Sequence, residues 1–240
     1  MKACGITDKG RVRRLNEDYY YLPEFSERFI AVADGMGGHA AGEVASFIAV
    51  KHLAASLRKA PCAGEARLLT AIEEANSAVY AAANSDVSRE GMGTTLTALW
   101  FSGNIVYLGH VGDSRAYRLR DRKLTQLSED HSYVEELVKS GVITREQART
   151  HPKRNLITRC IGVFNAIDPQ IVKLDHREAD RYLLCSDGLA GSVSDREIED
   201  TLNMDDVAPI RRLGILRDLA LRNGSTDNIT IAFVSGGDNA

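Results

Sequence analysis

Residues 29–43 constrain the fold of this 240-residue chain more than any other stretch. They begin with the apolar run FIAVA, which is too short for a helix and too apolar for an exposed edge, and which therefore predicts a strand deep in a sheet. The run stops at Asp34, followed by GMGGH. A carboxylate in such a place is costly unless its charge is compensated, and a hard cation with oxygen ligands is the simplest compensator. The alternative is a turn in which Asp34 caps a helix that begins near Ala40.

The same arrangement recurs along the chain, because further acids stand at the end or start of an apolar strand beside Gly or Asn. The four acids are Asp34, Asp113, Asp187 and Asp227, with Glu17-Asp18 as a fifth element. One such acid is a turn residue, but four predict that strand ends converge on a shared acidic site. Like charges so close repel or become protonated, unless cations compensate them. An all-oxygen site suits Mg²⁺ or Mn²⁺ rather than zinc or copper, and no His/Cys cluster competes for the assignment.

The order of apolar patterns predicts antiparallel sheets with helices. Residues 94–101 and 105–111 form a predicted hairpin, and 116–119 and 124–127 continue it, since consecutive strands on short turns favour antiparallel pairing. Helical spacing covers, among others, residues 42–57, a segment from Glu65, 194–202 and 209–223. No repeat, low-complexity tract or linker divides the chain, so we predict one domain over residues 1–240.

Residues 128–161 differ in character from the rest of the chain. They are polar, with short helices expected at 133–140 and 144–150, and few of them suit a common core. We interpret them as a flap subdomain over the site, although a simple connecting loop fits almost as well. His151, beside Arg154 in this segment, is a weak candidate for substrate contact.

Charge and hydropathy exclude several classes of partner. The net charge of −3 gives no case for a nucleic-acid partner, which a basic domain would indicate. No apolar run reaches about 18 residues and no signal-peptide pattern opens the chain, so we expect no membrane association. Four cysteines without a C-x-x-C spacing favour a reducing compartment, and we expect a cytoplasmic protein.

Three arginines lie close to Glu17-Asp18, at positions 11, 13 and 14. They fit a surface salt-bridge cluster. That is the simpler interpretation, but they also fit a strand edge that carries cations for a phosphate and anions for a metal ion, and these residues alone leave both interpretations open.

Six short motifs, taken in order, resemble the motif series of the metal-dependent PP2C-type Ser/Thr protein phosphatases, most closely the compact bacterial members. They are Arg13-x-x-x-Glu17-Asp18, Asp34-Gly35-x-Gly37-Gly38-His39, Gly93-Thr94-Thr95, Gly112-Asp113-Ser114-Arg115, Ser186-Asp187-Gly188-Leu189 and Thr226-Asp227-Asn228-Ile229-Thr230. Each is weak alone, but together they are specific and span almost the whole chain. The resemblance implies an α+β fold, a four-layer α-β-β-α sandwich of two antiparallel sheets flanked by helices.

The resemblance also implies a set of metal ligands. Asp34 would bridge two Mn²⁺ or Mg²⁺ ions, with Glu17 and the Gly35 carbonyl on one of them. Asp187 and Asp227 would hold the other, and Asp113 would help Asp187 to bind a third, weaker ion. A metal-activated water would then attack phosphorus, so that no Ser or Cys nucleophile is needed.

The remaining site roles come from the same resemblance. Arg13 would hold the substrate phosphate through its guanidinium. Asp18 would orient a metal-bound water. His39 is the candidate acid for the leaving alkoxide, although it stands four residues after Gly35, whereas in eukaryotic members the histidine directly follows Asp-Gly.

The expected function is hydrolysis of phosphoserine and phosphothreonine in proteins. The family implies phosphorylated Ser/Thr proteins as partners, including a bacterial Ser/Thr kinase that the enzyme opposes, and we expect a monomer. Three alternatives fit the pattern less well: a catalytically inactive relative, which would have lost metal ligands; a metal-dependent nuclease or phosphodiesterase, which the charge disfavours; and a calcium-binding module, which gives no reason for Arg13 and His39.

Overall fold

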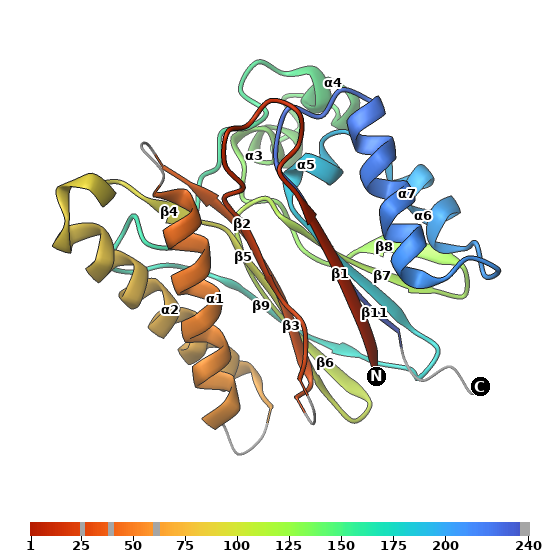
Figure 1. The fold of residues 1–240 in the computed structure, drawn as a ribbon, viewed down its shortest axis with the longest axis horizontal. Helices are drawn as coiled ribbons and strands as arrows, with labels where there is room; N and C mark the ends of the chain where they lie inside the picture. Colours follow the sequence, from red (N-terminus) through yellow and green to blue (C-terminus); the bar gives the residue numbers. More distant parts are fainter. Residues whose placement is uncertain (25–26, 38–40, 60–62, 236–240) are drawn as a thin grey trace.

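Two β-sheets face each other in the computed structural model, and helices cover both outer faces (Figure 1). The structure describes residues 1–24, 27–37, 41–59 and 63–235. The first sheet has the order β1-β11-β10-β7-β8, with bounds Lys2–Asp8, Ile229–Ser235, Arg181–Cys185, Arg115–Arg120 and Lys123–Gln126. The second has the order β2-β3-β5-β6-β9, with bounds Asp18–Tyr21, Phe29–Met36, Leu96–Ser102, Ile105–Val111 and Gln170–Asp175; β4 (Gly93–Thr94) also pairs with β3. All of these pairings are antiparallel.

Strand β3 is apolar throughout because both of its faces are buried. Successive side chains of a strand point to opposite faces. Ile30 and Val32 therefore enter the core between the two sheets, whereas Phe29, Ala31 and Ala33 pack on the helical side. The predicted deep strand is confirmed, and it carries Asp34 to one end of the sandwich.

The core between the sheets is built from alternate residues of both. Leu99 and Leu108 come from the second sheet, and Tyr182, Leu184 and Val234 come from the first. All five side chains are at most 1% exposed. Because this core fixes the two sheets against each other, it also fixes the strand ends that carry the acids.

Two helical layers complete the sandwich. Helices α1 (Gly42–Lys59) and α2 (Glu65–Ser85) cover the second sheet, with the short 3₁₀ helix Val87–Arg89 after α2. Helices α5 (Asp187–Ala190), α6 (Asp195–Leu202) and α7 (Pro209–Arg222) cover the first. Figure 1 shows the two groups on opposite sides of the sheets. The predicted four-layer α+β architecture is therefore confirmed.

The segment expected as a flap forms the two short helices α3 (Tyr133–Lys139) and α4 (Arg145–Thr150). They lie at the α5 end of the sandwich (Figure 1). Isolated β-bridges connect the segment internally between Ser132 and Ile157, and to β4 between Ile161 and Thr94. Within the described ranges, no helix is long and apolar enough to cross a membrane.

Candidate active site

The acidic residues singled out in the sequence converge at one end of the sandwich. Asp18 and Asp34 are direct register partners on β2 and β3. Asp187 follows β10, Asp113 follows β6, and Asp227 precedes β11. Two adjacent strands place like charges opposite each other here, which destabilises a sheet unless something compensates the repulsion.

The pKa values of these acids record how closely they lie. Burial raises the pKa of Asp34 well above its ordinary value, and the charges of Asp18, Asp187, Asp113 and Asp227 raise it further. Burial also raises the pKa of Asp18 to about 7, although the hydrogen bond from Ser186 lowers it. The four-fold recurrence of acids at strand ends therefore does form a single electrostatic cluster.

The neighbouring acids respond in the same way. Burial, with the charge of Asp227, raises the pKa of Asp187 to about 6. Burial and then the charge of Asp187 raise the pKa of Asp113 well above the ordinary value. Burial raises the pKa of Glu17 as well, although the nearby Arg13 lowers it. Several carboxylates thus share a site in which not all of them can ionise without cations.

These pKa shifts predict that the metal-free protein loses stability as the pH rises. A carboxyl whose pKa is raised by folding stabilises the fold below its unfolded pKa, near 3.8, and this contribution is lost as the pH passes the folded value. For Asp187 and Asp18 the folded values are about 6 and about 7. In EDTA, calorimetry from about pH 5 to about pH 8 should show a falling Tm, by roughly 2–4 °C per kcal/mol lost.

Asp18→Asn is the control for this pH dependence, because it removes one of the titrating groups without removing a buried polar side chain. Its Tm should fall less steeply over the same pH range, and Mn²⁺ should flatten the wild-type profile. A wild-type Tm that rises with pH in EDTA would show that the acid cluster does not destabilise the fold.

The donor chemistry of the cluster fits hard divalent cations. Oδ1 of Asp18 and Oδ1 of Asp187 are buried and accept no hydrogen bond from the part of the chain described here. Across the same residues, no three His, Cys, Asp or Glu side chains are already arranged around one point as ligands. Mg²⁺-type ions keep several waters as ligands, so buried carboxylate oxygens without hydrogen-bond donors fit such ions without a complete cage of side chains.

Glycines bring the backbone close enough to form this site. A Cβ on Gly35 would lie 2.0 Å from the Gly42 carbonyl oxygen and 2.5 Å from that of Glu17. A Cβ on Gly188 would lie 1.9 Å from the Asn228 carbonyl oxygen. Larger residues would therefore push apart the loops that bear Glu17, Asp187 and Asp227.

The backbone of Asp34 is held by Thr94, the last residue of β4, and by Thr95, which follows it. The Asp34 N–H donates to Thr95 Oγ1 at 2.9 Å, and the Asp34 carbonyl accepts from Thr94 Oγ1 at 2.8 Å and from Thr95 N at 2.9 Å. These bonds explain why one predicted strand, 94–101, is interrupted at Thr95. Helix α1 begins at Gly42, and residues 38–40 before it lie outside the described ranges, so the alternative in which Asp34 caps a helix near Ala40 stays untested.

Asn228 organises the N-terminal acid loop, a role that sequence reasoning missed. Its Oδ1 accepts from Glu17 N at 2.8 Å, and its Nδ2 donates to the carbonyls of Lys9 and Leu15, both at 2.9 Å. The side chain is 3% exposed, so these bonds replace its lost hydration. Its place beside Asp227 at the start of a buried strand was the available signal.

Ser186 is the second missed residue. Its hydroxyl donates to Asp18 Oδ2 at 2.8 Å and accepts from Thr230 N at 3.0 Å. It thereby orients the Asp18 carboxylate from the opposite sheet. A buried serine before Asp187 reads as an ordinary strand residue in the sequence, because its partner lies 168 positions away.

Arg13 lies at the rim of the cluster. Its Nη2 donates to Asp227 Oδ2 at 2.6 Å, and its Nη1 is 4.0 Å from Glu17 Oε2. The hydrogen bond to Asp227 raises the pKa of the guanidinium. Both open interpretations of the arginines retain support, since Arg13 is ion-paired and yet 48% exposed beside the acids.

His110 and His151 lie in different environments. His39 lies outside the described residues. His110 is fully buried between Thr97 and the Glu129 carbonyl, and burial lowers its pKa to about 3, so it is structural. In the flap, His151 accepts from the N–H of Lys153 through Nδ1.

Comparisons of this chain with family models, curated proteins and solved structures all match the same kind of protein. A family model described as Protein phosphatase 2C matches residues 10–213. The serine/threonine protein phosphatase PstP of Mycobacterium tuberculosis (strain H37Rv) is 45% identical over 233 residues, covering 96% of this chain and 44% of that protein. The serine/threonine phosphatase stp of Listeria monocytogenes (EGD-e) is 36% identical over 241 residues, covering 98% and 95%. The chain thus spans less than half the length of PstP but nearly all of the Listeria protein.

Solved structures match over nearly the full length. The crystal structure of the M. tuberculosis phosphatase PstP/Ppp has a TM-score of 0.90 at 44% identity, covering 97% of each chain. The PstP catalytic domain in complex with two manganese ions has a TM-score of 0.87 at 42% identity, covering 97% of this chain and 96% of that one.

Proposed function

The chain belongs to the protein phosphatase 2C family, and from this premise we propose that it is a metal-dependent protein Ser/Thr phosphatase. The observation that carries the proposal is the convergence of acids around Asp34, whose charges cannot coexist without cations. The names of the relatives, serine/threonine phosphatases from M. tuberculosis and Listeria, support the substrate class.

We propose the ligand assignments that the resemblance to the family implies, and the clustering of the acids around Asp34 supports them. Asp34 would be shared by two Mn²⁺ or Mg²⁺ ions, because it lies among the other acids. The ligands of one ion would be Glu17 and the Gly35 carbonyl, and those of the other Asp187 and Asp227. Such ions lower the pKa of water towards neutrality and neutralise charge on a phosphate. Asp113, beside Asp187, would help to hold a third and weaker ion.

The other side chains would handle substrate and protons. Asp18, fixed by Ser186, would orient a water through its free Oδ1. Arg13 would bind the non-reacting oxygens of the phosphate, since a guanidinium fork matches two of them. His39 would donate a proton to the leaving seryl or threonyl oxygen.

Arg13→Ala tests the role of this arginine. Loss of a charge-assisted hydrogen bond of roughly 1.5–3 kcal/mol should raise KM for a phosphopeptide about tenfold or more. Steady-state kinetics measures KM, and calorimetry of Mn²⁺ binding provides the control, because the tight sites should change little. If Mn²⁺ binding weakens while KM holds, Arg13 organises Asp227 rather than the phosphate.

We propose one catalytic domain over residues 1–240, with residues 128–161 as its flap subdomain. Its partners would be phosphorylated Ser/Thr proteins, including a Ser/Thr kinase that it opposes. We further propose that it acts as a monomer in the cytoplasm.

A comparison of substrates tests the proposed function. Purified protein should release phosphate from phosphoseryl and phosphothreonyl peptides in Mn²⁺, and this release should stop in EDTA. Single- and double-stranded DNA and RNA are the competing substrates. Cleavage of nucleic acid without peptide dephosphorylation would show that the protein is a nuclease. Mn²⁺ binding without turnover of any substrate would show that it is a binding module.

A further inference from the structure

A cavity of about 430 Å³ opens between the flap and the start of the α5–α6 region. Asp113 and Asp187 line it on one side, and residues of α3 and α4 line it on the other. The cavity is therefore continuous with the acid cluster and extends away from it under the flap.

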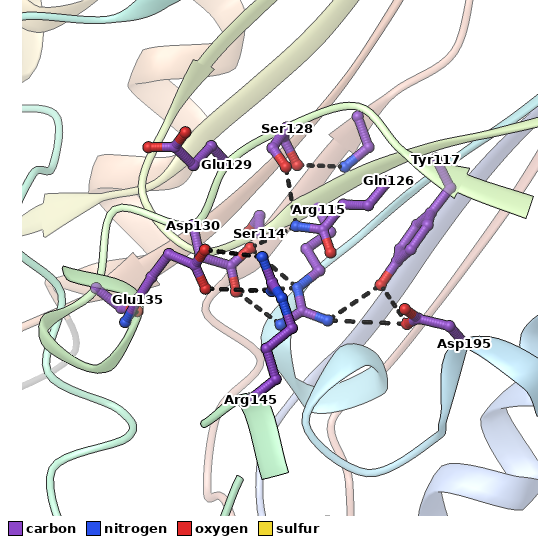
Figure 2. Close-up of polar contacts among 12 residues, drawn as sticks. Ser114, Arg115, Tyr117, Gln126, Ser128, Glu129, Asp130, Glu135, Arg145 and Asp195 are labelled. Carbon is purple, nitrogen blue, oxygen red and sulfur yellow. Dashed lines mark hydrogen bonds and ion pairs between the residues drawn. The ribbon is translucent and has the colours of Figure 1, made fainter. Parts of the chain in front are cut away.

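Two arginines of this cavity are already matched by carboxylates (Figure 2). Arg115 donates from Nε to both Asp130 oxygens at 3.0 Å and from Nη2 to Oδ2 at 2.7 Å. Arg145 Nη2 lies 3.1 Å from Glu135 Oε1. In each of these two pairs the carboxylate compensates the charge of the arginine.

The remaining lining acids in this region are also engaged. Asp195 accepts from the Tyr117 hydroxyl at 3.1 Å, in the network that Figure 2 shows around Arg115. Glu197 accepts from Ser194 N at 2.8 Å and from Ser194 Oγ at 2.7 Å, as part of a capping box. Neither needs a cation from the flap.

Arg149 and Arg154 differ from the other lining arginines. Arg149 stands in the last turn of α4, and Arg154 stands in the turn that follows, where its N–H donates to the His151 carbonyl at 3.1 Å. Across the described ranges, neither guanidinium forms an ion pair or a hydrogen bond, and both line the cavity. Two unmatched guanidiniums beside one cavity form a site for a carboxylate or a phosphate, whose oxygens they can bind bidentately.

We propose that this cavity is a second anion subsite, in which Arg149 and Arg154 bind an acidic or phosphorylated side chain of the substrate. The inference rests on the proposed function, since it concerns the residues flanking the phosphoresidue under hydrolysis. Asp113 and Asp187 line the side of the cavity that the proposed metal ions and the phosphate under hydrolysis would occupy, so a second anion would settle against the flap. A sphere of this volume is about 9 Å across, which an extended peptide covers in about three residues.

Binding by the metal-free protein tests the subsite without requiring turnover. Fluorescence anisotropy in EDTA would compare labelled phosphothreonyl peptides that carry Glu, a second phosphothreonine or Ala two to three residues away on either side. The wild type should bind an anionic peptide about tenfold more tightly than the alanine peptide. The double variant Arg149→Gln/Arg154→Gln should lose this preference.

Arg67→Gln is the matched control, because Arg67 is an exposed arginine of α2 outside the cavity. It should keep the wild-type preference. Equal wild-type affinity for anionic and alanine peptides would overturn the subsite, and so would a preference that survives in the double variant. The relative affinity for Glu and second-phosphate peptides identifies which anion the subsite favours.

Kinetics separates this inference from the proposed function. In Mn²⁺, kcat/KM should show the same preference as binding, and p-nitrophenyl phosphate, which has no second anion, tests hydrolysis alone. Absence of all phosphate release by the wild type would overturn the phosphatase function, whereas release without preference among the peptides would overturn only the subsite.

Discussion

Asp34→Ala should lose phosphatase activity by about 10³-fold or more, because it removes the carboxylate that the surrounding acids place at the centre of the site. Bound metal ions contribute several kcal/mol of charge stabilisation to phosphate hydrolysis, and each 1.4 kcal/mol corresponds to tenfold in rate. The change should not unfold the protein. Loss of a charge opposite Asp18 removes a repulsion, so the Tm in EDTA should equal or exceed that of the wild type.

The measurement for Asp34 is phosphate release in saturating Mn²⁺, with the Tm recorded on the same sample. Asp206→Ala is the matched control, since Asp206 is an exposed aspartate on the α6–α7 connection. Near-normal turnover by Asp34→Ala would contradict its role as the shared ligand. Loss of activity together with a much lower Tm would instead show that Asp34 is required for the stability of the fold.

Asp113→Ala should lower turnover strongly, by about 10²-fold, while the tight Mn²⁺ sites stay filled. Asp113 follows β6 and is close enough to Asp187 to have its pKa raised by that charge. It also lines the open cavity, so an ion held there would keep several waters and few protein ligands, and would bind weakly. The expected loss is therefore in kcat rather than in the tight binding isotherm.

Calorimetry and kinetics together decide among the roles of Asp113. Tight binding that disappears with Asp113→Ala would make it a ligand of the central pair. Unchanged turnover would make it a turn residue only. Full rescue by excess Mn²⁺ would show that the weaker ion needs no carboxylate at this position.

The sequence predicted the parts of the fold that local pattern determines. The apolar run of β3 predicted a buried strand, and acids repeated at strand ends predicted their convergence, because a packed sandwich brings such ends together. Strand β9 was not predicted, since the side chains of Gln170–Asp175 are half-buried or exposed and its apolar residues do not alternate strictly with polar ones. The helical turn that begins at Asp187 was also missed, because Asp-Gly reads locally as a turn.

Interactions between distant residues could not be read from the sequence. Asn228 reaches the Glu17 loop across 211 positions, and Ser186 reaches Asp18 from the other sheet. Arg115 belongs to a recognised motif, but its carboxylate partner lies in the flap segment, at Asp130. Local periodicity does not predict such pairings, because they depend on how the two sheets pack against each other.

Titration of metal-free protein with Mn²⁺, with heat and phosphate release followed together, tests the central claim most directly. A phosphothreonyl peptide is the substrate. We predict that turnover is absent in EDTA, that about two equivalents bind tightly, and that phosphate release begins only once those sites fill. Peptide dephosphorylation in EDTA, or a protein that binds two equivalents of Mn²⁺ and releases no phosphate at any higher concentration, would contradict a metal-dependent phosphatase built on these acids.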